Sequence, residues 1–158
     1  AYEIYQCDWS SDVCSSDLNA APDQVFLAWS KPSLKARWFV GPRGQWKEKI
    51  RESNFRVGGR ERLIGSWSDG RVTTFDCRYL EIIANERIAY SYEMFIDKTR
   101  ISMSLANVQL TPSGASTRLR YHEHAVFLNG FADNGGREQG TRALLDQLES
   151  VLRVKPMC

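Results

Sequence analysis

The chain lacks the long apolar runs and compositional biases that mark several protein classes. No stretch of about 18 consecutive apolar residues occurs, which argues against a membrane-spanning helix. No basic segment leads into an apolar one near the N-terminus and no Asn-x-Ser/Thr acceptor is present, so we expect a cytoplasmic protein. Proline is scarce, with 5 residues, and the aromatic fraction of 11% argues against disorder. The 158 residues therefore predict one globular domain with its own core.

The chain also lacks a cysteine pattern typical of metal or disulfide sites, and its net charge is small. The four cysteines (Cys7, Cys14, Cys77 and Cys158) match no common zinc spacing, and a domain of this size does not need disulfide staples. The net charge is +2, or +6 without the four acids of residues 1–18, and it is scattered without a basic run or an RNA-binding aromatic signature, so we expect no nucleic-acid partner. Neither GxGxxG nor GxxxxGK[ST] occurs, and we expect no cofactor.

The first 18 residues differ from the rest of the chain. The segment 8–18, DWSSDVCSSDL, has neither a helical period nor strand alternation, and it resembles the translation of a short-read sequencing adapter. We interpret residues 1–18 as a non-native segment of metagenomic origin that replaces a native first strand. Residues 19–155 are then the domain.

The remaining pattern predicts an α+β domain. Two short helices are indicated within residues 21–39, and the period is mostly two from residue 44 to about 126, which predicts about six antiparallel strands. The alternation changes phase near Ala106, which predicts a bulge or a twist there. A long closing helix carries one apolar stripe, with Asp133 or Asn134 as its cap. A curved sheet with this helix across its concave face is the simplest packing.

Four segments carry a resemblance to a known family. AWSKPSLKARWFVGP, FRVGGRERL, TRLRYHEHAVFLNGF and REQGTRALLDQLESVL follow one another in the order found in the SRPBCC superfamily, the START-like proteins of helix-grip fold. Within it the chain resembles the bacterial branch named after the activator of the heat-shock-protein-90 ATPase. The resemblance covers residues 19 to about 153. It implies the helix-grip fold and a cavity between the long helix and the sheet, and it makes a homodimer one expectation.

Ten side chains are candidates for lining such a cavity. They are aromatic, aliphatic or acidic residues at inward-facing positions: Trp38, Phe75, Tyr79, Tyr90, Tyr92, Met94, Glu123, Phe127, Leu144 and Leu148. Gly140 on the long helix would leave room above the sheet. Aromatic rings with phenolic tips suit a mostly apolar ligand that carries a few polar groups. The alternative for each residue is plain core packing.

Glu123 shares strand parity with Tyr121 and is expected to point inward, where an unpaired carboxylate is costly. It would orient a ligand, accept a proton, or pair with an arginine such as Arg78. His122 and His124 fall on the opposite, solvent-facing side without a third ligand, so we expect no metal site. Cys77 is expected to be an inert buried thiol.

The favoured function is binding of a small hydrophobic or amphipathic molecule, because the inward positions yield no nucleophile with an activator and no acid–base pair. No catalytic residue is therefore assigned. One alternative is an enzyme of the polyketide-cyclase type, in which Glu123 and a tyrosine move protons. Another is a co-chaperone-like domain that acts on the heat-shock-protein-90 ATPase through a protein partner.

Overall fold

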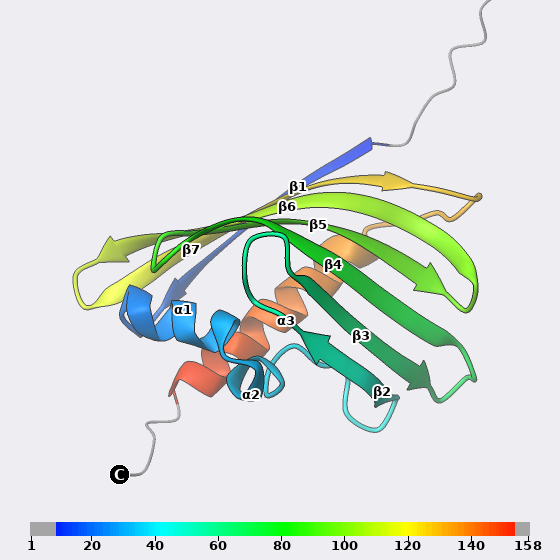
Figure 1. Cartoon of the computed structure of the whole chain (residues 1–158), viewed down its shortest axis with the longest axis horizontal. Coiled ribbons are helices and arrows are strands. Elements are labelled where there is room, and N and C mark those ends of the chain that lie inside the picture. The colour runs from blue at the N-terminus through cyan, green and yellow to red at the C-terminus, as the bar shows by residue number, and fades with distance from the viewer. Residues whose placement is uncertain (1–8, 154–158) are drawn as a thin grey trace, which may run out of the picture.

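Within the part of the chain that the structure describes, residues 9–153, seven antiparallel strands form one sheet and three helices lie on one of its faces (Figure 1). The structure is a computed structural model, with side chains described from residue 13 onward. The elements are β1 (Trp9–Leu18), α1 (Pro22–Ser30), α2 (Pro32–Lys35), β2 (Trp46–Ser53), β3 (Arg60–Trp67), β4 (Val72–Ile83), β5 (Arg87–Ile96), β6 (Thr99–Ser113), β7 (Ser116–Phe127) and α3 (Gly136–Arg153).

The sheet order is β1-β7-β6-β5-β4-β3-β2, so each strand from β2 to β7 pairs with the next strand along the chain. These strands are the six that the sequence predicts between residues 44 and 126. The sheet curves around α3, which crosses its concave face beside α1 and α2 (Figure 1). The predicted α+β helix-grip fold is confirmed.

A further strand, β1, forms in the segment whose sequence shows no strand alternation. It pairs with β7 from Trp9↔Val126 to Leu18↔Thr117, and it buries Cys14 and Leu18. Asp17 on its outer side accepts a hydrogen bond from Arg118 Nε at 2.9 Å. Pairing satisfies backbone donors and acceptors that β7 would otherwise leave open at the edge of the sheet. The place of a first strand is thus filled, whatever the origin of these residues.

The predicted phase change near Ala106 is wrong in position. Along β6 the even-numbered residues from Ser102 to Leu110 are buried without interruption, and Met103 and Leu105 are exposed on the outer face. The register shift lies instead between Met94 and Phe95 of β5, opposite the start of β6. Met103 and Leu105 are apolar but exposed, so the sequence pattern alone places them on the wrong face of β6.

The two short helices are held together by tryptophan. In α1 the proline at the first turn fixes the start, and Val25, Ala28 and Trp29 face the core. Trp38, which follows α2, donates a hydrogen bond from Nε1 to the backbone oxygen of Ala28 at 2.9 Å. Its ring meets the Trp29 ring edge-on, with centroids 4.8 Å apart. The pair forms a rigid corner beside the sheet.

Helix α3 begins where the sequence predicts. Asp133 Oδ1 accepts the backbone N–H of Arg137 at 2.8 Å, which confirms Asp133 as the capping residue. Leu145 and Leu148 on its inner side are buried against the sheet. The amphipathic stripe therefore determines which side of α3 faces the sheet.

Gly65 of β3 is covered by the Trp46 indole. A Cβ at Gly65 would lie 1.9 Å from a ring atom of Trp46, and one at Gly41 would lie 2.4 Å from the same ring. We expect Gly65→Ala to lower the free energy of unfolding by about 1–3 kcal/mol, because the ring must leave its packed position. Urea denaturation measures the loss. Gly140→Ala is the control: nothing lies within 4 Å of its added Cβ, so it should be neutral or stabilising.

Candidate functional site

A pocket of about 770 Å³ lies between α3, strands β3 to β5 and the segment that follows α1. Six of the ten predicted residues line it: Trp38, Phe75, Tyr90, Tyr92, Met94 and Leu144. The other four lie outside its lining: Tyr79, Glu123, Phe127 and Leu148. Leu148 is fully buried on the inner side of α3, whereas Tyr79 and Glu123 belong to two buried polar clusters described below.

The helix side of the pocket includes three small residues among larger ones such as Arg137 and Leu144. Gly136, Gly140 and Ala143 of α3 all line it, spaced so that they follow one another along the helix. An added Cβ at Gly140 would meet nothing within 4 Å, and Gly140 is exposed at the edge of the pocket, so the room it was expected to leave above the sheet stays a prediction. Larger side chains at these positions would fill the pocket.

The sheet side of the pocket is a chain of aromatic rings. Trp38 meets Phe39 at a centroid distance of 5.7 Å, Phe39 meets Phe75 at 5.0 Å, and Phe75 meets Tyr92 at 4.9 Å. Each ring is held by the next in edge-on or tilted geometry, which is favourable for aromatic pairs. The wall is therefore apolar and preformed.

Glu123 is buried behind this wall and is fully hydrogen-bonded. Its Oε1 accepts from the Tyr92 hydroxyl at 2.5 Å and from Arg137 Nη1 at 3.1 Å, and its Oε2 accepts from the Tyr121 hydroxyl at 2.9 Å. The inward orientation is confirmed, but the suggested partner Arg78 is wrong: Arg78 lies on the exposed side and donates to the backbone oxygen of Gly58. The arginine comes instead from the first turn of α3.

Arg137 connects α3 to the sheet and also lines the pocket. Its Nη1 donates to the Tyr92 hydroxyl at 3.0 Å and lies 3.2 Å from Ser104 Oγ, while Nη2 donates to Ser102 Oγ at 2.6 Å. The guanidinium lies 5.5 Å from the Tyr92 ring centroid and 5.4 Å from that of Phe127. Phe127 thus contributes by packing against Arg137. These contacts hold the positive charge of Arg137 in place, and the Arg137 side chain is only 13% exposed.

Burial keeps the phenols beside this cluster protonated. It raises the pKa of Tyr90, Tyr92 and Tyr121 above the ordinary tyrosine value, and the nearby Glu123 carboxylate raises all three further. At neutral pH these groups are hydrogen-bond donors rather than bases. An acid–base enzyme needs a group in the pocket that can accept a proton. The protonated phenols cannot, so their shifted pKa values do not favour an enzyme.

A second buried cluster joins α2 to the sheet. Lys35 Nζ lies 2.6 Å from Glu61 Oε2 and 3.2 Å from the Tyr79 hydroxyl, and that hydroxyl also donates to Glu61. The ammonium group lies over the rings of Trp29 and Phe39, at 5.3 and 4.7 Å from their centroids. Both charged side chains are at least 95% buried. The cluster fixes the short helix beside the pocket.

Sequence reasoning missed Arg137, Lys35 and Glu61, although two of them left a signal. Arg137 lies seven residues before Leu144, so it extends the apolar stripe of α3 toward the sheet. Glu61 shares parity with Leu63 and is therefore inward-facing like Glu123. Each buried carboxylate needs a cationic partner, so the inward positions of Glu123 and Glu61 together indicated two buried cations.

The other chemistry-bearing residues lie where the sequence places them. His124 is exposed and His122 half-buried on the outer face, with ring centroids 4.5 Å apart. Among the described residues no group of three or more His, Cys, Asp or Glu could hold a metal ion. Cys77 is buried, as expected, and burial raises the pKa of its thiol to about 12, which favours the protonated form at neutral pH.

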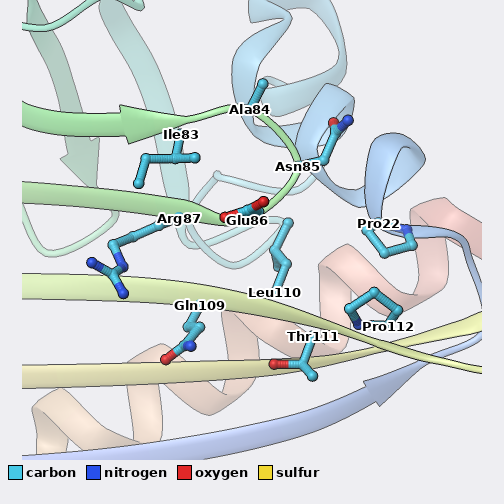
Figure 2. A pocket seen from close by; sticks show the side chains of 10 residues that line it. All are labelled: Pro22, Ile83, Ala84, Asn85, Glu86, Arg87, Gln109, Leu110, Thr111 and Pro112. Atoms are coloured by element: carbon cyan, nitrogen blue, oxygen red, sulfur yellow. The ribbon is translucent and has the colours of Figure 1, made fainter.

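A smaller pocket of about 410 Å³ lies at the far end of the sheet, between the β4–β5 turn, the end of β6 and the start of α1 (Figure 2). Its lining residues are Pro22, Ile83, Ala84, Asn85, Glu86, Arg87, Gln109, Leu110, Thr111 and Pro112. It has no aromatic side chain and contains none of the predicted site residues. The larger pocket is therefore the candidate site.

None of the helices within residues 9–153 is both long and apolar enough to cross a membrane.

Comparison with known proteins gives a family and several structural relatives. Residues 19–153 match the family described as Activator of Hsp90 ATPase homolog 1-like protein. A solved protein from Rhizobium leguminosarum is 39% identical, with a TM-score of 0.90, over 95% of this chain and 98% of its own. One from Rhizobium loti is 35% identical, with a TM-score of 0.85, over 93% and 99%.

A protein from Chromobacterium violaceum is 23% identical and has a TM-score of 0.77, over 92% of this chain and 98% of its own, which supports the shared fold. The search of curated proteins gives no match. The family match covers most of the chain and begins directly after the adapter-like segment. The chain belongs to the family of Activator of Hsp90 ATPase homolog 1-like proteins, within the SRPBCC superfamily.

Proposed function

We propose that the chain binds a small, mostly apolar molecule in the pocket beneath α3. The observation that carries the proposal is the pocket itself: about 770 Å³, within the range of small-molecule sites, with a preformed aromatic wall on one side and α3, which includes two glycines, on the other. A few polar groups converge at one end, around Arg137. This combination of apolar walls and few polar contacts is typical of ligand sites.

The polyketide-cyclase alternative receives less support from the geometry. Glu123, its proposed proton acceptor, is 1% exposed and its two oxygens already accept three hydrogen bonds. A substrate in the pocket would meet Arg137 before it met this carboxylate. The co-chaperone alternative has one supporting observation, the exposed apolar pair Met103 and Leu105 on the outer face. Homodimer formation stays a prediction.

Native mass spectrometry of the protein purified from a bacterial host tests the proposal. We expect a discrete added mass that disappears on denaturation. An apo mass that does not shift across a panel of lipids and polyketides would contradict it.

A graded pair of variants shows whether such a ligand occupies this pocket. Gly140→Leu places a branched side chain at the exposed edge of the pocket, and should weaken ligand binding at least ~10-fold by obstructing it. Gly140→Ala adds one methyl group and should leave most of the binding. Both variants should melt at or above the parent temperature, since each improves helix propensity. Equal binding by both would place the ligand elsewhere.

A further inference from the structure

The polar end of the pocket is marked by the guanidinium of Arg137, with Asp133 and Gln139 also in the lining. Arg137 carries five N–H groups, and in the described part of the chain its Nη1 and Nη2 have acceptors but its Nε has none. The described side-chain nitrogens that are both fully buried and unpartnered are Trp29 Nε1, Arg62 Nε and Arg87 Nε. Nε of Arg137 therefore stays accessible, on a residue that lines the pocket.

The acceptors beside Arg137 are already occupied. Both oxygens of Glu123 are hydrogen-bonded and out of reach, and the Tyr92 and Tyr121 hydroxyls donate their hydrogen bonds to this carboxylate. Asp133 is the one acidic residue in the lining, and its Oδ1 caps α3. Arg71 also lines the pocket, but its half-exposed guanidinium is already paired with Asp69, which leaves Arg137 as the cation for a ligand.

We infer that the occupant of this pocket carries a carbonyl or carboxylate oxygen on its apolar body, and that this oxygen accepts a hydrogen bond from Arg137. The inference rests on the proposed function and adds the chemistry of the polar group. An amine would place a second cation beside Arg137, and the one acidic residue of the lining, Asp133, already caps α3 through Oδ1, so the amine's desolvation would be less well compensated. A carbonyl or carboxylate oxygen would instead satisfy the open donor, and a carboxylate would form a charge-assisted bond.

Displacement of an uncharged fluorophore, N-phenyl-1-naphthylamine, tests the inference with three probes that share a ten-carbon chain: decanoate, 2-decanone and decylamine. At neutral pH we expect decanoate and 2-decanone to displace it at concentrations at least ~10-fold below that of decylamine, the effect of one hydrogen bond to a charged donor. The order of the first two shows whether the natural group is charged or neutral. Decylamine equal to or better than both would overturn the inference.

Arg137→Gln should abolish the preference, so that the three probes fall within about threefold of one another. Arg142→Gln is the matched control: it makes the same change on α3, at an exposed residue whose partner is Glu138, and should keep the preference. Arg137→Lys retains a cation for Glu123 but loses the planar donor, and should weaken the preference while the protein stays folded. Unchanged discrimination in both Arg137 variants would overturn the inference.

The outcomes separate the two proposals. If the fluorophore and all probes fail to bind, the proposed function fails and the inference fails with it. If the probes bind without regard to their polar group, the pocket stands and only the inference falls.

Discussion

Replacement of Glu61 by glutamine is expected to lower the free energy of unfolding by about 3–5 kcal/mol, the usual cost of leaving one buried charge without its partner. Lys35 Nζ lies 2.6 Å from Glu61, and the two side chains are 5% and 2% exposed, so water cannot replace the lost carboxylate. The affected contacts hold α2 against β3 and β4. Urea denaturation of parent and variant, with a two-state fit, gives the difference.

Two further variants define what the result means. Asp69→Asn breaks the pair with Arg71, in which both side chains are 51% exposed, and should cost no more than about 1 kcal/mol. The double variant Lys35→Met with Glu61→Leu should recover most of the loss, because an apolar pair often replaces a buried ion pair without penalty. A loss for Glu61→Gln no larger than that for Asp69→Asn would show that the buried pair does not stabilise the fold.

Above about pH 10 the folded state is expected to lose stability steeply. Burial raises the pKa of Cys77 to about 12 and raises the pKa of Tyr79, Tyr90, Tyr92 and Tyr121 as well. In the unfolded chain these groups ionise near their ordinary values, so at alkaline pH the unfolded state binds fewer protons than the folded one. Their contribution to stability is therefore complete below about pH 9 and falls as pH rises toward the folded-state values.

The size of the effect follows from the number of groups. Each contributes about 1.4 kcal/mol per pH unit within its window, so the five together give about 7 kcal/mol per unit above pH 10. This matches the whole stability of an ordinary domain, so unfolding near pH 11 is expected. Tyrosinate absorbance and far-ultraviolet circular dichroism, followed in one titration, should change together for the buried tyrosines.

Tyr121→Phe should make this alkaline transition less steep by about 1.4 kcal/mol per pH unit, since one titrating group is removed. Ionisation of all the tyrosines near pH 10 with unchanged circular dichroism would contradict the prediction, because it would show that the phenols are accessible in the folded state.

Local sequence signals were sufficient for much of the fold. Alternation determined the inward sides of β4, β5 and β7, because side chains of a strand point to opposite faces in turn. For that reason Glu123 and Tyr92 were correctly expected to face inward. The apolar stripe and Asp133 determined where α3 begins and which side it buries, because capping and helical periodicity act within a few residues.

Long-range contacts decided the rest. β1 has no strand pattern of its own and forms because β7 offers an open edge, so its strand state depends on residues about 110 positions away. Its origin as translated adapter sequence stays a prediction. The partner of Glu123 was likewise misassigned, because strand parity determines where a carboxylate points but not which arginine of another element reaches it.

The sequence by itself determined the fold class, the family and six residues of the pocket lining, because alternation, periodicity and capping are local properties. Only the tertiary structure decided that Arg137 joins Glu123, that Lys35 joins Glu61, and that the glycines of α3 lie opposite an aromatic wall. That the pocket binds a ligand stays a prediction. The physical reason for the division is that charge pairs and cavities depend on the relative placement of elements, which burial of the whole core determines.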